Sequence, residues 1–541
     1  MTEATQNAKG ITRRELLKGA AVGATALGAG AMLESCSPQQ AATPPAAGTA
    51  APVKYSFEVA PAPIAKGDIK QSEDADVVVI GAGVSGLMAA LSAAEAGAKT
   101  ILIEKSAKFN ARGGHNAAIN SKIQQSEGLK YTPGQVARDL VRSYGNRVDS
   151  QLVMLWAENV SPIMDYLIDL AAKYKIQVLR WGNDVPTAYY PEYKTVHMFG
   201  AMDETIMAGM LEKEAIAKGA IIHYSMAAAQ LVRPQNAGRV TGVIAGAAGN
   251  YTQFNAANAV IVATGDYGHN PEMIQAWCPA AANVDGNVYS PPVNTGDGQK
   301  MGLWVGGAIH PEHVPMIHNL GAAPFSGNPF LRVNVLGERY ENEDVPIPSM
   351  ANSIQLQPQR KTWTIYDSTF VDDLPKAGLS FSRVNAMSDM TQQAMDAALK
   401  QGDSALIKAD TLDDMAKRMG VPVEAFKATV ARYNALTQKG SDDDFGKNPD
   451  MLSMIDTPPF YAAFNSIVLL VTLGGLKVNT KLQVLDANDT VIPGLYASGN
   501  AAGGFFARDY PVIVPGQSHS RAWTTGRLAG QNAAADKGSG A

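Results

Sequence analysis

The chain has 541 residues, of which 46% are hydrophobic and 18% charged, a composition typical of a globular protein with more than one domain and a large core. The net charge of −5, with no basic tract beyond the N-terminus, gives no reason to expect a nucleic-acid partner. Cys36 and Cys278 are the only cysteines, so the chain alone can hold neither an iron–sulfur cluster nor a covalently attached c-type haem, and electrons for any redox chemistry must come from a separate partner.

The N-terminus has the pattern of an export signal. The segment Thr12-Arg-Arg-Glu-Leu-Leu-Lys18 contains twin arginines, and small and apolar residues follow from Gly19 to Leu33. That stretch is too short and too rich in alanine and glycine for a membrane span, whereas a basic start and an apolar middle are typical of a signal peptide. We therefore expect residues 1–36 to be a twin-arginine signal that places the protein in the periplasm or on the outer face of the cytoplasmic membrane.

Cys36 is a candidate site of lipid attachment. The sequence Leu33-Glu-Ser-Cys36 partly resembles a lipoprotein cleavage site, although Glu34 is atypical there, and plain cleavage near Ala31 is the alternative. Residues 37–70 are rich in alanine, proline and glutamine, which predicts a flexible linker.

The stretch that begins at Val77 predicts a nucleotide-binding turn. The apolar run Val77–Ile80 shows no alternation, as expected of a parallel strand that is buried on both faces. Gly81, Gly83 and Gly86 follow in GxGxxG spacing, and a helical pattern begins at once. These glycines allow a tight turn, close approach of a pyrophosphate, and close packing of helix on strand, while the helix N-terminus attracts the phosphates.

A second apolar strand supports the same interpretation. Residues Thr100–Ile103 form it, and Glu104 follows, which places an acid where it can bind a ribose hydroxyl. An isolated GxGxxG is weak evidence. The order of strand, helix, second strand and acid, however, predicts a dinucleotide-binding fold rather than an incidental glycine-rich turn.

The rest of the chain alternates between this fold and an inserted segment. Residues 219–264 have strand character, and Asn294–Gly298 leads into a helix over Gln299–Val305. Residues 311–455 lack a parallel-strand rhythm and mix short strands with helices, which predicts a second domain. The first pattern then returns, and the chain closes on a helix over Ser520–Ala533.

Several motifs together resemble the fumarate reductase/succinate dehydrogenase flavoprotein family, particularly its exported soluble reductases, and also the 3-ketosteroid dehydrogenases. The resemblance covers about residues 73–535. It rests on Val79-Ile-Gly-Ala-Gly83, Gly113-Gly114, Ala263-Thr-Gly-Asp-Tyr-Gly268, Thr295-Gly-Asp-Gly298, Gly337-Glu-Arg-Tyr with Asn342-Glu343, Gly474-Gly475, and Gly494-Leu-Tyr-Ala-Ser-Gly499.

This resemblance implies an α/β fold: a Rossmann-type FAD-binding domain with a parallel sheet, plus an inserted α+β capping domain. The FAD-binding domain would comprise residues 71–310 and 456–541, and the cap residues 311–455. We expect FAD to be bound without a covalent link; His115 lies where succinate dehydrogenases carry a flavin-linked histidine, so covalent attachment is the alternative. The residues assigned to FAD are Gly81, Gly83, Val84, Ser85, Gly86, Glu104, Lys105, Gly113, Gly114, His115, Gly265, Asp266, Asp297, Gly499, Asn500 and Arg521.

The chain departs from the family where fumarate reductases bind a dicarboxylate. The place of a family histidine reads Val471-Thr-Leu473, the segment Asp344–Ser349 lacks the proton-donating arginine, and a carboxylate-clamping arginine is replaced by Tyr510. A buried carboxylate without its arginines loses charge-assisted hydrogen bonds worth about 1.5–3 kcal/mol each. We therefore do not expect fumarate to be the natural substrate.

Tyr510-Pro511 instead resembles the tyrosine–proline pair of ketosteroid dehydrogenases, whose hydroxyl polarises a ketone. A phenol can hydrogen-bond an enone oxygen or pass a proton without carrying charge at neutral pH. We assign Tyr510, with Arg508 and His318, to catalysis; an ion pair at the surface and a structural histidine are the alternatives for the latter two. No metal site is expected, because Pro311 interrupts the pair His310 and His313.

The resulting expectation is an exported FAD-dependent oxidoreductase that acts on CH–CH bonds and reduces the activated C=C bond of a small enone or enoate. Hydride would leave flavin N5, and electrons would come from an external cytochrome or a membrane quinol-linked donor. A 3-ketosteroid-type dehydrogenase, a fumarate-type reductase and a flavin electron shuttle without an organic substrate remain as alternatives.

Overall fold

The computed structural model describes residues 55–537 except 181–192, 202, 288–289, 320–322, 325–326, 346 and 374–388. The expected signal, the lipid-attachment candidate Cys36 and most of the expected linker lie outside these residues. Within the described ranges, no helix combines the length and apolar character that a bilayer crossing requires.

The main sheet is built around β1 (Ile69–Ile80), in which Val77–Ile80 is fully buried as the apolar run predicts. Its strand order is β17-β18-β9-β1-β2-β6, and β7 and β8 extend it beside β9. β1 pairs in parallel with β2 and with β9, and β2 with β6 and β9 with β18 likewise run parallel. The strand bounds are β2 Thr100–Ile103, β6 Ile221–His223, β7 Ala228–Val232, β8 Gly242–Ala247, β9 Asn250–Val262, β17 Gln483–Leu485 and β18 Val491–Ala497.

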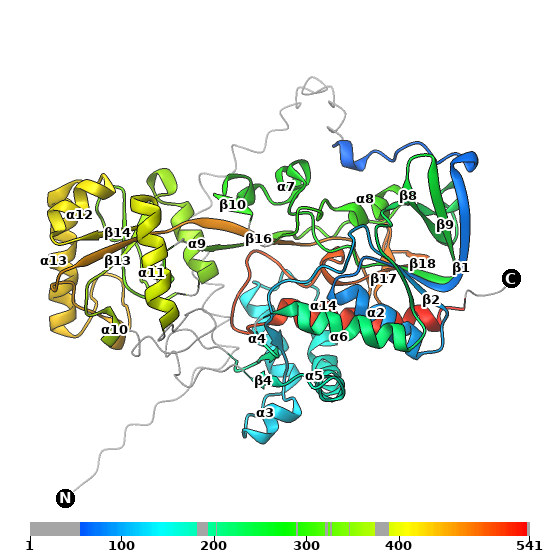
Figure 1. Ribbon diagram of the computed structural model, residues 1–541, viewed down its shortest axis with the longest axis horizontal. Coiled ribbons are helices and arrows are strands. Elements are labelled where there is room, and N and C mark those ends of the chain that lie inside the picture. Colours follow the sequence, from blue (N-terminus) through cyan, green and yellow to red (C-terminus); the bar gives the residue numbers. More distant parts are fainter. Residues whose placement is uncertain are drawn as a thin grey trace, which may run out of the picture. The chain divides into compact units, whose positions relative to one another are not determined.

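Two helices far apart in the sequence pack side by side on this sheet (Figure 1). They are α2 (Val84–Glu95), which follows the glycine turn, and α14 (Gln517–Ala535), which closes the chain. Glycines on α14 allow the contact: a Cβ on Gly526 would lie 2.3 Å from the Ser85 carbonyl oxygen, and one on Gly530 would lie 2.3 Å from that of Ala89. The last helix thus reaches back to the first turn of the fold.

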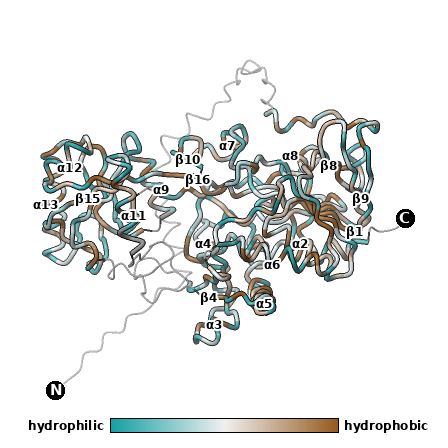
Figure 2. The backbone as a smooth tube through the Cα atoms, viewed as in Figure 1, coloured by the Kyte–Doolittle hydropathy of each residue, from teal (hydrophilic) through white to brown (hydrophobic). Residues whose placement is uncertain are grey.

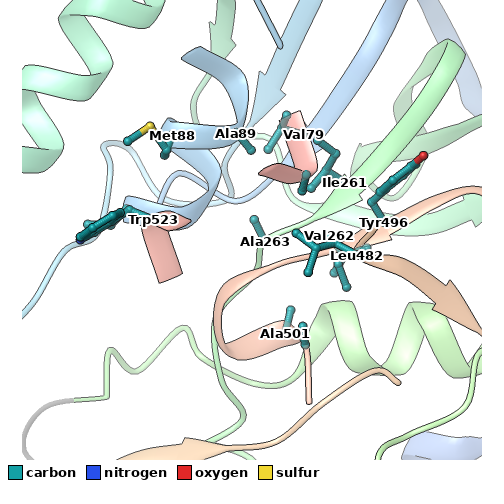
Figure 3. Close-up of a cluster of buried hydrophobic side chains, with 14 of the residues drawn as sticks. Val79, Met88, Ala89, Ile261, Val262, Ala263, Leu482, Tyr496, Ala501 and Trp523 are labelled. Carbon is teal, nitrogen blue, oxygen red and sulfur yellow. The ribbon is translucent and has the colours of Figure 1, made fainter. Parts of the chain in front are cut away.

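The main core lies between these elements. Figure 2 shows that the hydrophobic residues are concentrated on the strands of the main sheet, and Figure 3 shows part of the cluster, with Val79 of β1, Ile261 of β9 and Ala89 of α2. Further helices around this part of the chain are α3 Lys122–Ser126, α4 Pro133–Ser143, α5 Ser150–Lys173, α6 Glu204–Ala217, α7 Pro271–Trp277 and α8 Asp297–Trp304. A small sheet pairs β3 (Asn116–Ala117), β5 (Val196–Phe199) and β4 (Val178–Arg180).

The inserted segment has its own antiparallel sheet and core. The strand order is β12-β13-β15-β14, with β12 Leu331–Asn334, β13 Thr362–Tyr366, β14 Leu406–Ala409 and β15 Phe460–Phe464. β15 follows residue 455, so this sheet extends beyond the segment that the sequence marks as the insert. The helices of the insert are α9 Ile347–Gln355, α10 Phe370–Asp373, α11 Asp389–Gln401, α12 Leu412–Met419 and α13 Val423–Lys439.

Two strands connect the insert to the rest of the chain. β11 (Val314–Asn319) leads into it, and β16 (Ile467–Leu473) leads out. They pair antiparallel with each other, and β10 (Gly286–Asn287) pairs with β16. The α/β fold with a parallel sheet is therefore confirmed, and a strand pair spans the junction with the inserted domain.

Candidate active site

A cavity of about 420 Å³ lies at the carboxyl ends of the main parallel strands. Ile80 at the end of β1, Ile103 at the end of β2 and Ala263 just after β9 all line it. Ligands of open α/β sheets bind at this edge. The lining includes many residues that the sequence assigns to FAD: Gly81, Gly83, Val84, Ser85, Glu104, Lys105, Gly113, His115, Gly265, Asp297, Gly499 and Asn500.

The glycine turn has the tight backbone that its spacing predicts. Gly81 adopts φ +105°, and a Cβ there would lie 2.6 Å from the Ala263 carbonyl oxygen. Gly86 does not line the cavity; a Cβ on it would lie 1.9 Å from the Gly81 carbonyl oxygen, so its role is to let α2 begin directly over the turn. The N-terminus of α2 therefore borders the cavity, where it suits a pyrophosphate.

Glu104 is held in place by the backbone. Its carboxylate accepts hydrogen bonds of 2.8 Å from the amides of Ala82 and Ser106, and it lies at the end of β2. A carboxylate has further lone pairs, which remain for a ribose hydroxyl. The cavity edge formed by the two strand ends thus fits the sugar and phosphates of a dinucleotide.

The loop that carries Gly113 contacts a histidine that the sequence does not single out. His519, in the first turn of α14, lines the cavity, and a Cβ on Gly113 would lie 2.3 Å from its Cε1. His519 Nδ1 lies 3.0 Å from the His115 carbonyl oxygen. Burial, and secondarily the charge of His519, lowers the pKa of His115 to about 4, so His115 is a neutral imidazole at neutral pH. Gly114 does not line the cavity.

Asp266 turns away from the cavity, unlike the sequence-based assignment. Its buried carboxylate accepts hydrogen bonds from Ser290 Oγ at 3.1 Å, from the Thr472 amide at 3.0 Å and from the Asn294 side chain. Arg112 completes this set with an ion pair of 3.2 Å. Asp266 thus fastens the loop after β9 to β16 rather than binding the cofactor directly.

Arg508 and Arg521 also lie outside the lining. Arg508 is exposed, has a left-handed backbone (φ 64°) and lies beside Gly145. Arg521 is buried and donates to the Gly499 carbonyl oxygen and to Asn500 Oδ1, two residues that do line the cavity. Arg521 therefore contacts Gly499 and Asn500 without lining the cavity itself.

The strand pair at the junction with the insert also contributes to the cavity lining. Met316 and His318 of β11 and Leu470 and Val471 of β16 line it, and Met316 pairs with Val471 in the sheet register. The insert adds Pro348 from the first turn of α9, and the C-terminal segment adds Tyr510 and Ser518. Apolar residues thus occupy the region where the family resemblance places a histidine and an arginine.

His318 is a buried histidine without a hydrogen-bond partner on Nε2 among the described residues. Only 7% of the residue is exposed. Burial lowers the pKa of His318 to about 4, so it faces the cavity as a neutral ring. A buried polar atom of this kind is unsatisfied unless a ligand or water binds it.

Tyr510 presents its hydroxyl at the N-terminus of α14. The Ser518 amide donates to the Tyr510 oxygen at 3.2 Å, and the described residues offer no acceptor for the phenolic proton. Burial raises the pKa of Tyr510, so the phenol is neutral at neutral pH. The proton is thus available to an oxygen of a ligand.

Lysine and arginine in the lining are already paired with carboxylates. Lys105 lies 2.6 Å from Asp297, and Arg112 lies 3.2 Å from Asp266. Nothing in the local sequence marks Arg112 beyond its place beside Gly113, because its partner Asp266 is distant in the chain. The lining therefore combines residues that fit a dinucleotide with the neutral polar groups of Tyr510 and His318.

The chain is similar to several known proteins. A family profile described as FAD binding domain matches residues 76–511. A vinyl phenol reductase from Lactiplantibacillus plantarum is 28% identical over 489 residues, which cover 85% of this chain and 96% of that protein. A fumarate reductase (cytochrome) from Shewanella frigidimarina is 27% identical over 473 residues, which cover 85% of this chain and 77% of that protein.

The fold is also shared with a solved structure. The 3-ketosteroid delta1-dehydrogenase from Sterolibacterium denitrificans has a TM-score of 0.69 and 20% identity, over 86% of this chain and all of that one. The expected family and the expected FAD cofactor are thus confirmed, and the glycine turn, Glu104 and the α2 N-terminus are residues that fit FAD. The chain belongs to the FAD-binding family of fumarate reductase-like flavoproteins, oxidoreductases that act on carbon–carbon bonds.

Proposed function

We propose that this protein reduces the activated C=C bond of a small, uncharged conjugated acceptor such as an enone. One observation carries the proposal: the substrate end of the cavity offers two neutral polar side chains, Tyr510 and His318, among apolar residues, while Lys105 and Arg112 are already ion-paired. An uncharged acceptor loses little on entering such a site, whereas an unpaired carboxylate would be strongly penalised.

FAD, when bound and reduced by the electron donor, would supply the hydride for the C=C bond. Tyr510 hydrogen-bonds the acceptor oxygen and polarises the conjugated system, and it gives its one phenolic proton to the acceptor as hydride adds to the C=C bond. The Ser518 amide fixes the Tyr510 oxygen during this step. Met316, Leu470 and Pro348 exclude water around the reacting carbons.

His318 is the second polar group toward the acceptor. Its neutral ring, with Nε2 unpartnered among the described residues, can bind a hydroxyl or carbonyl group of the ligand. Being neutral, it does not replace the charged groups that a dicarboxylate requires. This separates the proposed substrate from fumarate.

The relatives support the class of acceptor. The name of the Lactiplantibacillus plantarum relative states vinyl phenol, a compound with a conjugated C=C bond and no carboxylate. The opposite reaction, dehydrogenation of a ketosteroid-like substrate, is favoured by Tyr510-Pro511, and the reduction potential of the electron partner would set the direction. A flavin electron shuttle needs no such acceptor space, so residues of the insert in the cavity favour an organic substrate.

We also propose an external electron donor and a periplasmic location for this protein. The donor is an external cytochrome or a membrane quinol-linked protein, because the two cysteines of the chain cannot hold a relay cluster. The twin-arginine signal takes the folded protein to the periplasm, and Cys36 is a candidate lipid anchor there. Cell fractionation of a variant with Arg13→Lys and Arg14→Lys tests this part: retention in the cytoplasm is expected, and unchanged export would refute it.

An anaerobic substrate screen tests the reaction. The purified holoprotein is reduced with viologen, and the flavin absorbance is followed after addition of an enone, a vinyl phenol or fumarate. We expect rapid recovery of the oxidised spectrum with an uncharged acceptor and slow recovery with fumarate. Fumarate as the fastest acceptor would contradict the proposal, and recovery with a redox protein alone would favour the shuttle.

A further inference from the structure

Arg521 is a buried cation without a carboxylate partner in the part of the chain that the structure describes. Only 2% of the residue is exposed, and no aspartate or glutamate of that part forms an ion pair with it. By contrast, Arg527 on the same helix pairs with Glu95 at 3.0 Å. A buried charge without a counter-ion is costly, so its retention calls for a function.

Neutral groups surround the guanidinium. It donates to the Gly499 carbonyl oxygen and, at 2.5 Å, to Asn500 Oδ1. Its Cζ lies 5.0 Å from the ring centroid of Phe506 and 5.9 Å from that of Phe505. Hydrogen-bond acceptors and aromatic faces hold the cation in place without cancelling its charge.

Phe506 links this cation to Tyr510. The rings of Phe506 and Tyr510 stack at 5.6 Å between centroids, with 24° between their planes. The guanidinium and the phenol of Tyr510 thus both contact Phe506. The Tyr510 oxygen also accepts from the Ser518 amide in the first turn of α14, the positive end of that helix.

Few other charged or titratable groups surround Tyr510. The neighbouring Asp509 accepts from the Tyr510 amide at 2.7 Å. Tyr144, whose ring meets Phe506 edge-on, donates its hydroxyl to Gln517. His318 lines the same cavity, and Arg508 is exposed. Arg521 is therefore the buried cation of this set.

We propose that Arg521 is a positioning residue that acts through Tyr510: its uncompensated charge stabilises the phenolate that remains when Tyr510 gives its proton to the acceptor. This inference rests on the proposed function. In that step the O–H bond of Tyr510 breaks as a bond from the proton to the acceptor forms, and a proton from solvent later restores the phenol. Negative charge builds up on the Tyr510 oxygen in this step. The amides at the N-terminus of α14 and the positive charge of Arg521 both stabilise it.

Direct measurement of the acidity at position 510 tests the inference. A fluorinated tyrosine, which ionises at lower pH than tyrosine, replaces Tyr510 in the holoprotein, and its ¹⁹F resonance is titrated. We expect Arg521→Gln to raise the titration midpoint by about one unit, the order of effect of a unit charge across one ring in a protein interior. Arg521→Lys, which keeps the charge, restores most of the shift, and Arg527→Gln leaves the midpoint unchanged.

The outcomes separate this inference from the proposed function. An unchanged midpoint in Arg521→Gln, or an equal shift in Arg527→Gln, would overturn the role of Arg521 even if the enone is reduced. In the chain with native Tyr510, we expect Arg521→Gln to lower kcat for the enone about tenfold with little change in KM, as for an interaction made in the transition state. Failure of the wild-type protein to reduce any uncharged acceptor would instead refute the proposed function. The shift in the titration midpoint of the fluorinated tyrosine would still measure the coupling between Arg521 and position 510.

Discussion

Two buried arginines, one in the capping sheet region and one beside the cavity, have opposite surroundings. Arg339 donates to both oxygens of Glu343 at 2.8 Å and pairs with Asp442 at 2.8 Å, and all three side chains are buried. Arg521 has no carboxylate partner among the described residues and contacts one backbone carbonyl oxygen, one side-chain amide oxygen and aromatic rings. The same side chain is neutralised in one region and left charged in the other.

The paired arginine belongs to a network that stabilises the fold, whereas the arginine without a carboxylate partner lies beside the cavity. The family motif Gly337-Glu-Arg-Tyr with Asn342-Glu343 supplies the cap with a closed charge network, which Lys447 joins at 3.3 Å from Glu343. Such a network positions the chain but leaves no net field for a ligand. Among the described residues, His318 Nε2 has no hydrogen-bond partner and the Tyr510 hydroxyl has no acceptor for its proton, as expected where a substrate completes the hydrogen bonds.

Breaking the network in the cap has the largest expected effect. Arg339→Gln leaves the buried carboxylates of Glu343 and Asp442 without their main partner, so we expect the free energy of unfolding to fall by about 3–5 kcal/mol. Urea denaturation of the holoprotein measures this. Arg418→Gln is the matched control in the same domain, because its ion pair with Asp403 is largely exposed, and a loss of about 0–1 kcal/mol is expected. Equal losses in both variants would show that the buried network contributes nothing special.

The second-largest effect is expected from removal of the Tyr510 hydroxyl at the cavity. Tyr510→Phe keeps the ring stack with Phe506 but removes the proton donor, so we expect kcat for enone reduction with reduced viologen to fall about 10²–10³-fold. Tyr496→Phe is the control, since its hydroxyl bonds Asp536 and it does not line the cavity. Near-normal turnover of the Tyr510 variant would remove Tyr510 from the mechanism.

The sequence located the glycine turn and the acid at the cavity because backbone geometry decides their positions. A positive φ at Gly81 and the absence of room for a Cβ at Gly86 both require glycine, so the glycine spacing, together with the flanking strands and helix, located the turn. The same reasoning located Glu104, whose place follows from the end of a short strand.

Side chains whose role depends on distant partners were harder to assign. Asp266 follows a predicted strand as a cofactor ligand would, but its carboxylate is turned toward Asn294 and Thr472 by contacts that no local pattern encodes. His519 was missed because the last helix was expected to begin at Ser520, whereas α14 begins at Gln517 and carries His519 in its first turn. The position of a helix N-terminus is among the least certain features of a sequence.

A smaller effect is expected from the neutral histidine. The pKa of His318 is lowered to about 4 by burial, while the unfolded chain binds a proton near pH 6.5. Between these values the unfolded state binds more protons than the folded one, so stability falls as the pH drops from 6.5 toward 4. His318→Gln should remove about 1–2 kcal/mol of the loss between pH 7 and pH 5, as measured by unfolding at each pH. Identical pH profiles for variant and wild type would mean that His318 is not buried as a neutral ring.

We expect the smallest change in the free energy of unfolding for Arg521→Gln, in direct contrast to Arg339→Gln. Burial lowers the pKa of Arg521 to about 10 from the 12.5 of a free side chain, so the folded state binds this proton less tightly than the unfolded one. That cost is fully present below pH 10 and disappears as the pH rises through 12.5. Arg521→Gln removes the cost but also the hydrogen bonds to Gly499 and Asn500 and the contact with Phe506, so the two effects offset each other. We expect a change within about 1 kcal/mol in urea unfolding at pH 7, against the several lost with Arg339→Gln. A loss as large as that of Arg339→Gln would make Arg521 a structural residue and would leave its isolation from carboxylates without a function.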